Sequence, residues 1–212
     1  WFTRAPRELS ALVSMESWVA TNVETATAEP RTMSEVEHAV NAAEPAAFVV
    51  EQRVLRRVIK HHLLSHLGLH VPERDAYAIE REVLLEIVER DELAPTEVPL
   101  PDVVYLIARI PDEEAPPGGL PALLREYWRR VFRCRVESTV AGRFQRGEVT
   151  AAQLKQRIAR IGQPEYDEVR SVLHNDDLVL PPRTEEAIYS VFASRFLELR
   201  YFAPEQLGDF FP

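Results

Sequence analysis

The stretch PALLREYWRRVFRCRVESTVAGRFQR, at positions 121–146, decides the fold class because it has the pattern of one long amphipathic helix. Its apolar residues recur three and four positions apart, as they do along one face of a helix: Leu124, Trp128, Val131, Phe132, Val136, Val140 and Phe144. Seven arginines share the stretch, so we expect charged flanks beside the apolar face. Only 7 of the 212 residues are glycine, which also favours helices over a sheet-rich fold.

Other parts of the chain show the same periodicity. A second long helix is predicted over 46–67, between Pro45 and Gly68, since proline is common at helix starts and glycine at helix ends. Shorter helices are predicted from Ser34, where Glu37 completes a capping box, and over 80–92. Further helices follow Thr150, Pro164 and Thr184. The predicted fold is mainly α, a multi-helix orthogonal bundle.

Two segments are predicted as either strands or helices. In 103–110 the β-branched residues suit a buried strand, whereas Asp102 as an N-cap suits a short helix. In 69–79 a tight turn at Glu73-Arg74-Asp75 would give a small hairpin, and the alternative is a loop that leads into a helix near Pro72. We therefore allow for one short β-hairpin or strand pair over 69–79 and 103–110.

The expected organisation has three parts. Residues 1–44 form a helical segment and linker, residues 45–110 a helical subdomain with the possible hairpin, and residues 111–212 a C-terminal helical bundle. The alternative is one continuous domain. The chain opens at Trp1 without a methionine, so we expect a fragment of a longer protein.

Composition narrows the class of protein. Hydrophobic residues make up 46% of the chain and charged residues 28%, as in globular domains. No apolar run is long enough to cross a bilayer, so we expect no membrane partner. The single cysteine, Cys134, excludes a disulfide framework and fits a reducing, cytoplasmic setting. The sequence contains no P-loop, no dinucleotide-binding glycine motif, no HExxH and no GxSxG, and we expect no cofactor and no enzymatic activity.

Charge alternates in blocks along the chain, whose formal net charge is −9. Residues 45–72 sum to +3, residues 73–102 to −7 and residues 123–160 to +7. One interpretation is that basic and acidic segments pair within the fold. The other is that a basic surface meets an acidic partner outside it.

The first candidate binding site is a basic helix face. Arg53, Arg56, Arg57 and Lys60 are spaced i, i+3, i+4, i+7, so they share one side of the predicted helix. Arginine forks grip phosphate and carboxylate groups with two hydrogen bonds. This face is therefore a candidate contact for an acidic protein or for nucleic acid, with Arg129, Arg130 and Arg133 as candidate additions.

The second candidate is a metal site. His62 and His66 are four residues apart on the same predicted helix face, where two imidazoles can share a zinc ion. Glu51 or an acidic residue from 80–92 would have to supply the third ligand. The simpler interpretation is that His62 extends the apolar face and that His66 lies at a helix end, where a cation is favoured.

Aromatic residues near the two ends of the chain form the third candidate. Phe2, Phe210 and Phe211 must be buried by the domain itself or by a partner. Together these patterns predict a non-enzymatic helical interaction or scaffold domain that binds another protein or the remainder of its own chain. A nucleic-acid-contacting module and a metal-dependent enzyme built on His62 and His66 are the alternatives.

Overall fold

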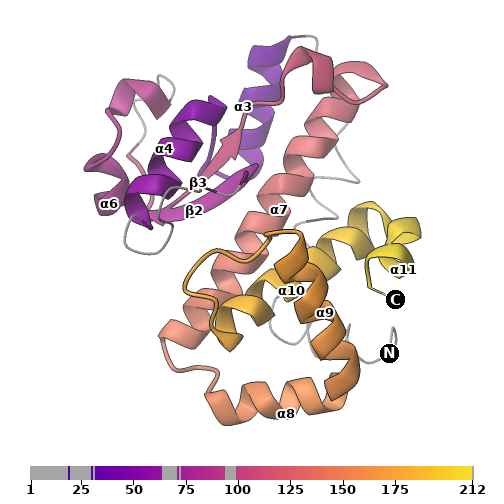
Figure 1. Cartoon of the computed structure of the whole chain (residues 1–212). Coiled ribbons are helices and arrows are strands. Elements are labelled where there is room, and N and C mark those ends of the chain that lie inside the picture. The colour runs from indigo at the N-terminus through magenta and orange to yellow at the C-terminus, as the bar shows by residue number, and fades with distance from the viewer. Residues whose placement is uncertain are drawn as a thin grey trace. The chain divides into compact units, whose positions relative to one another are not determined.

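The chain forms two compact units in a computed structural model, which describes residues 19, 30, 32–63, 71, 73–93 and 99–211. Ala20–Cys134 is the α/β unit, and Arg135–Pro212 together with Trp1–Val19 is the helical unit. Helices predominate and the strands form one small sheet, so the prediction of a mainly α fold is confirmed (Figure 1).

The α/β unit is built around a three-stranded sheet in the order β1-β3-β2. Strand β3 (Val103–Ala108) pairs in parallel with β1 (Ala47–Val50) and antiparallel with β2 (Ala76–Glu80). The predicted strand pair is thus confirmed, with the partner of 103–108 provided by 76–80. The first arm of the hairpin predicted within 69–79 lies largely outside the described residues, so that hairpin stays a prediction, whereas its second arm is β2, which pairs with β3.

Helices cover both faces of this sheet. Helix α4 (Gln52–His62) buries Val54, Leu55, Val58 and Ile59, and lies on one side. Helix α3 (Met33–Ala43) and the first part of α7 (Gly119–Gln145) lie on the other side (Figure 1). The other elements that the structure describes in this unit are short: α6 (Arg81–Leu85), η2 (Arg90–Leu93) and η3 (Asp112–Glu114).

Three helix predictions in this unit need correction. The helix expected over 46–67 begins only at Gln52, because Ala47–Val50 extends and pairs with β3. Its predicted end lies outside the described residues. The helix expected over 80–92 is α6 followed by turns and η2, although Leu84 and Val88 of its predicted apolar stripe are buried. Helix α3 is capped by Thr32, whose Oγ1 accepts from the Glu35 amide at 3.2 Å, and not by Ser34.

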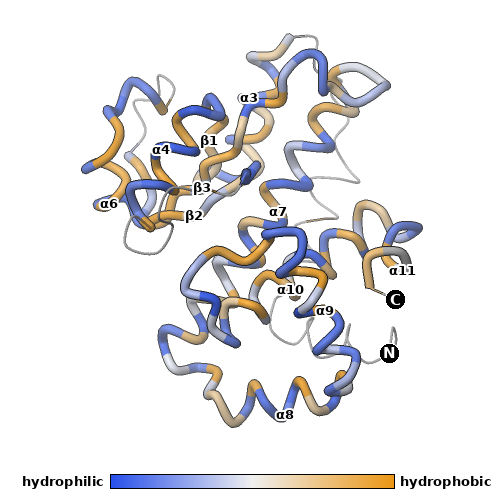
Figure 2. The backbone as a smooth tube through the Cα atoms, in the orientation of Figure 1, coloured by the Kyte–Doolittle hydropathy of each residue, from blue (hydrophilic) through white to orange (hydrophobic). Residues whose placement is uncertain are grey.

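Capping residues in the sequence correctly predict where the helices of the helical unit begin and end. Helix α8 (Ala151–Ile161) has a complete capping box between Thr150 and Gln153, and it ends at Gly162, where φ is 121°. Its hydropathy alternates along the tube in Figure 2, as its apolar spacing predicts. Helix α9 (Gln163–Asn175) carries the predicted proline in its first turn, and Thr184 caps α10 (Glu185–Phe202). The chain ends with η4 (Pro204–Gln206) and α11 (Leu207–Phe210).

Helix α10 is the centre of the helical unit. It is buried on nearly all sides, which is expected only of a helix inside a core. Its aromatic residues stack with rings from α9 and from the end of the chain at centroid distances of 5.6 to 6.2 Å: Tyr166, Tyr189, Phe192, Phe196 and Phe211. Its buried carboxylate, Glu198, is met by Arg195 at 3.1 Å.

Two buried tyrosines, one in each unit, differ in how their hydroxyls are satisfied. In the α/β unit the Tyr127 hydroxyl accepts a hydrogen bond from the Ile110 amide at 3.0 Å. In the helical unit Tyr166 is 1% exposed, and its hydroxyl has no hydrogen-bond partner among the described residues. Burial raises the pKa of both phenols, and it is the first cause in each case.

The same substitution should therefore act with opposite sign at the two positions. Tyr127→Phe leaves the Ile110 amide buried and unpaired, and we expect it to lower the free energy of unfolding by about 1–2 kcal/mol. Tyr166→Phe removes only an unsatisfied hydroxyl, so we expect no loss or a gain of up to about 1 kcal/mol. Urea unfolding followed by circular dichroism at neutral pH measures both. Losses of equal size would contradict the difference in hydrogen bonding.

Alkaline pH should amplify the effect of Tyr166. The folded state holds this phenol protonated, whereas the unfolded chain ionises it near its ordinary pKa of about 10. Stability from this group is therefore complete below about pH 10 and is lost as pH rises above it, at up to about 1.4 kcal/mol per pH unit. We expect the stability of the wild type to fall more steeply between about pH 10 and 11 than that of Tyr166→Phe. Parallel curves would show that Tyr166 ionises normally in the folded chain.

Candidate functional site

The basic face predicted from the sequence is present on α4. Arg53, Arg56, Arg57 and Lys60 are all exposed, whereas the opposite side of the helix is buried against the sheet. Arg56 and Lys60 form no hydrogen bond or ion pair with any residue that the structure describes. The face therefore presents cationic groups that the described part of the fold does not neutralise.

Arg57 is the member of this face that is paired within the unit. Its Nη2 lies 2.7 Å from both carboxylate oxygens of Glu92, which is a residue of η2. Glu92 also accepts from the Glu89 amide at 3.1 Å. The hydrogen bond from Arg57 is the main reason that the pKa of Glu92 is lowered, so this carboxylate stays ionised at neutral pH. Arg57 thus ties α4 to η2.

Side chains at the start of α4 help to fix its position. At its start, the Gln52 amide donates to the Arg74 carbonyl at 3.0 Å. Glu51, the residue before the helix, accepts from Arg109 at 3.0 Å, and Arg109 also pairs with Glu37 of α3 at 2.6 Å. Exposed ion pairs are individually weak, but several together restrict the orientation of the helix.

His62, half of the candidate metal site, lies at the other end of α4. Its Nδ1 is 3.0 Å from the Tyr77 hydroxyl, and the two rings meet edge to face at 5.9 Å. The partner proposed for it, His66, lies outside the described residues. Within those residues, no group of three or more His, Cys, Asp or Glu side chains could hold a metal ion. The structure thus gives His62 a hydrogen-bonding role, and the metal site stays a prediction.

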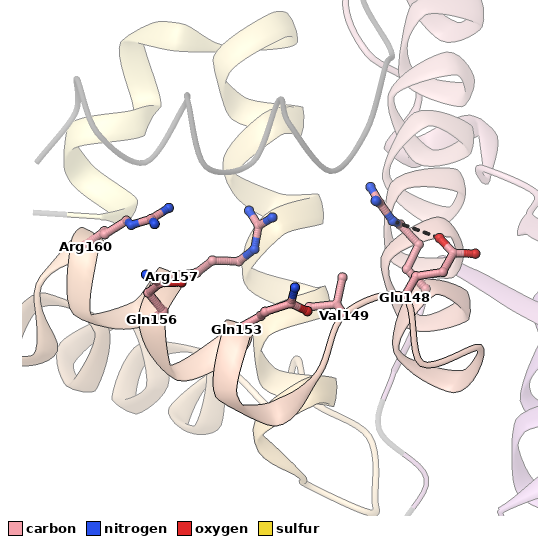
Figure 3. Close-up of a pocket in the computed structure, with 7 residues that line it drawn as sticks. Glu148, Val149, Gln153, Gln156, Arg157 and Arg160 are labelled. Atoms are coloured by element: carbon pink, nitrogen blue, oxygen red, sulfur yellow. Dashed lines mark ion pairs between the residues drawn. The ribbon is translucent and has the colours of Figure 1, made fainter.

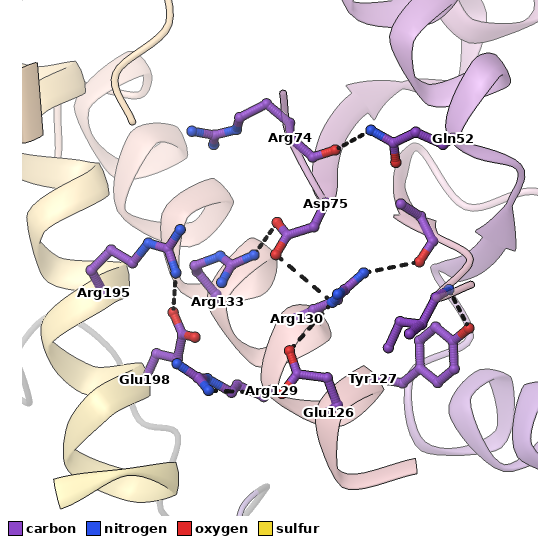
Figure 4. Close-up of polar contacts among 12 residues, drawn as sticks. Gln52, Arg74, Asp75, Glu126, Tyr127, Arg129, Arg130, Arg133, Arg195 and Glu198 are labelled. Carbon is purple, nitrogen blue, oxygen red and sulfur yellow. Dashed lines mark hydrogen bonds and ion pairs between the residues drawn. The ribbon is translucent and has the colours of Figure 1, made fainter. Parts of the chain in front are cut away.

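The arginines of α7 that were considered as additions to the basic face lie in a different cluster, centred on Asp75 (Figure 4). Arg133 is 5% exposed and pairs with the Asp75 carboxylate. Arg130 lies 3.8 Å from the other Asp75 oxygen, and it donates to the Ala108 carbonyl at 3.2 Å. Arg129 lies 3.7 Å from Glu126. Arg130 and Arg133 therefore join α7 to the sheet.

The aromatic candidates near the chain ends have separate surroundings. Phe211 is fully buried, with its ring 5.6 Å from Phe192 and 6.0 Å from Phe196, so the helical unit itself supplies its burial. Phe210 is half-buried and packs against Phe211 at 5.1 Å. Phe2 lies outside the described residues. Contact of these residues with a partner stays a prediction, and Phe210 is the described one that retains exposed surface.

Comparison with protein-family models, with curated proteins and with solved structures found no match to this chain. None of the helices in the described ranges is both long and apolar enough to cross a membrane. The candidate site therefore has to be interpreted from its own residues.

The Asp75 cluster allows a test of how far the buried charge of Arg133 and the charge of Asp75 depend on each other for the stability of the α/β unit. Asp75→Asn should remove the carboxylate that pairs with the buried Arg133 guanidinium, and we expect a loss of about 2–3 kcal/mol in the free energy of unfolding. In an Arg133→Met background the buried charge is gone, so the same asparagine substitution should cost less than about 1 kcal/mol. Urea unfolding of the four proteins in this double-mutant cycle measures the coupling. Additive losses would mean that the two groups do not depend on each other.

Proposed function

We propose that this chain is a protein-interaction domain and that the basic face of α4 binds an acidic segment of a partner protein. The observation that supports this proposal is the state of Arg56 and Lys60. Both are exposed, one helical turn apart, and neither is neutralised by a described residue. Arg53 extends the same face by a further turn and lies close enough to Glu92 to help lower its pKa.

The fixed position of α4 favours binding. The helix is held by its buried apolar face, by Gln52 at its start, by the Arg57–Glu92 pair and by the His62–Tyr77 contact. A surface that is already ordered loses little conformational freedom when a partner binds. The side chains of Arg56 and Lys60 still have to be ordered, so we expect modest affinity with a strong dependence on salt.

The size of the face favours a short acidic peptide segment over nucleic acid. Arg53 to Lys60 spans about 10 Å along the helix axis, at about 1.5 Å per residue. Nucleic-acid binding at physiological salt usually requires many phosphate contacts along an extended basic surface. The chain as a whole has a net charge of −9, which opposes a polyanion beyond the immediate contact. Binding to nucleic acid is the alternative that the same experiment tests.

The test compares two charge-reversed variants with the same net charge. Arg56→Glu/Lys60→Glu reverses the proposed surface and leaves the Arg57–Glu92 pair in place. Lys155→Glu/Arg200→Glu is the matched control, because both residues are exposed and lie in the helical unit. Fluorescence anisotropy with a labelled oligo-glutamate peptide and with a labelled single-stranded RNA measures binding at low and physiological salt.

We expect the wild type and the control to bind the peptide with similar affinity, and the α4 variant to lose about tenfold or more. An equal loss of affinity in both variants would mean that only the net charge of the chain matters, and it would contradict a specific binding surface on α4. The nucleic-acid alternative would be favoured if the chain bound RNA but not the peptide, and if this RNA binding were sensitive to salt and abolished by the α4 substitutions. Circular dichroism of both variants checks that the fold is retained.

A further inference from the structure

An acidic turn lies between β3 and α7 in the α/β unit. Asp112, Glu113 and Glu114 are the consecutive residues of η3, and all three side chains are exposed. Their carboxylates form no hydrogen bond or ion pair with any residue in the described ranges. The turn therefore presents negative charge that the described part of the fold does not neutralise, just as the basic face of α4 presents positive charge.

The backbone holds this turn in place. Just before it, the buried Ile110 donates its amide hydrogen to the Tyr127 hydroxyl at 3.0 Å. The turn itself is closed by the Glu114 amide, which donates to the Pro111 carbonyl at 3.0 Å. Prolines also follow it at 116 and 117, and each proline ring restricts its own φ. The carboxylates are therefore carried by an ordered backbone, which loses little conformational freedom when a partner binds.

The acidic turn and the basic face of α4 do not pair within one copy of the chain. Among the described residues, no ion pair joins η3 to Arg56 or Lys60. The turn leads into α7, whose first part lies on the opposite side of the sheet from α4 (Figure 1). One unit thus carries two exposed surfaces of opposite charge on different parts of its structure.

Basic side chains in other clusters already have acidic partners. In the polar pocket of the helical unit, Arg143 lies 3.2 Å from Glu148 (Figure 3). In the α/β unit, Arg133 pairs with Asp75. An external carboxylate would have to compete with these internal ones, whereas it meets no such competitor at Arg56 and Lys60. The basic face of α4 is therefore the better place for an acidic segment to bind.

We propose that the acidic segment bound by the basic face of α4 is the η3 turn of a second copy of this chain. This inference rests on the function proposed above and names the partner. Arg56 and Lys60 are one helical turn apart, with about 5–6 Å between their Cβ atoms. The Cα atoms of Glu113 and Glu114 are about 3.8 Å apart. The long side chains on both surfaces can make up this difference, so each cation can meet one carboxylate.

The contact joins two different surfaces, so it is head-to-tail. A copy that binds through its α4 still has its η3 turn free to bind a further copy, and such contacts build rings or open chains of copies. Exposed ion pairs are individually weak, and the net charge of −9 on each copy adds long-range repulsion. At about 0.1 M salt the Debye length is about 10 Å, which screens this repulsion more than it screens ion pairs in direct contact. We therefore expect weak association that depends on concentration.

Sedimentation velocity of the whole purified chain at increasing concentration tests the proposal. At about 0.1 M salt the sedimentation coefficient should rise with concentration, with an apparent Kd of about 1 mM or lower. At about 1 M salt, where the Debye length is about 3 Å, the association should weaken by about tenfold or more. A sedimentation coefficient that stays constant up to about 1 mM protein at the lower salt concentration would overturn the proposal.

Two charge-reversed variants locate the contact. Arg56→Glu/Lys60→Glu makes the α4 face acidic, and Glu113→Lys/Glu114→Lys makes the η3 turn basic. Each should weaken self-association by about tenfold or more, because like charges then meet at the contact. Two matched controls lie at exposed positions of the helical unit and should associate like the wild type: Lys155→Glu/Arg200→Glu and Glu168→Lys/Glu205→Lys. Equal losses in a variant and its control would overturn a specific contact.

A mixture of the two variants gives the sharpest result. In the mixture, the unchanged η3 turn of the α4 variant can meet the unchanged α4 of the η3 variant, and the two reversed surfaces are also opposite in charge. We therefore expect association to return in the mixture, although neither variant associates alone. Each variant changes the net charge of −9 by four, so both stay negative and general attraction cannot produce this result. A mixture that sediments like its separate components would overturn the pairing of α4 with η3.

Binding of the labelled oligo-glutamate peptide separates this inference from the proposed function. The η3 variant keeps its α4 face, so it should bind the peptide at least as well as the wild type, and an excess of peptide should dissociate wild-type assemblies. Peptide binding by a wild type that does not self-associate would overturn only the identity of the partner. Loss of both would overturn the proposed function as well. Circular dichroism spectra that match the wild type check that each variant is folded.

Discussion

The α/β unit depends on one ion pair, in which the carboxylate of Asp75 meets the buried guanidinium group of Arg133 on α7. Desolvating such a charge is unfavourable by several kcal/mol unless a counter-ion is close and the remaining donors are used. Asp75 is that counter-ion, and it also lies near Arg130. Because Asp75 immediately precedes β2 and its carbonyl accepts from the Ala108 amide at 2.8 Å, one residue connects α7, the start of β2 and the end of β3. This connection ties α7 to two neighbouring strands of the sheet.

Much of the fold could be predicted because its signals are local. A threonine before α8 and another before α10 satisfy free backbone amides, and Gly162 provides the positive φ at which α8 ends. Strand β1 could not be predicted in this way. Ala47–Val50 continues without a break into the apolar pattern of α4, and only its pairing with β3, more than fifty residues further along the chain, gives it an extended conformation. Long-range pairing of this kind leaves no periodic signal in a segment of four residues.

The charge blocks show where sequence reasoning reaches its limit. Basic segments do pair with acidic ones inside the α/β unit, at Arg57 with Glu92 and at Arg133 with Asp75. A block sum could not say which arginines are used in this way, because that depends on which side of a helix faces the core. Arg56 is adjacent to Arg57 in sequence, yet it has no ion pair with a described residue. The candidate contact surface is therefore what remains of the basic block after internal pairing.

The exposure of Lys60 and Lys155 has a practical consequence for chemical labelling. Lysine occurs at only these two positions of the sequence, and the other side chains with a permanent positive charge are arginines. Lys60 belongs to the basic face of α4, and Lys155 lies on α8. An amine-selective reagent can therefore attach to one side chain in each unit, and peptide mapping can distinguish these two adducts from each other and from an adduct on the α-amino group. Footprinting and cross-linking thus distinguish the two units in the native chain without any engineered residue.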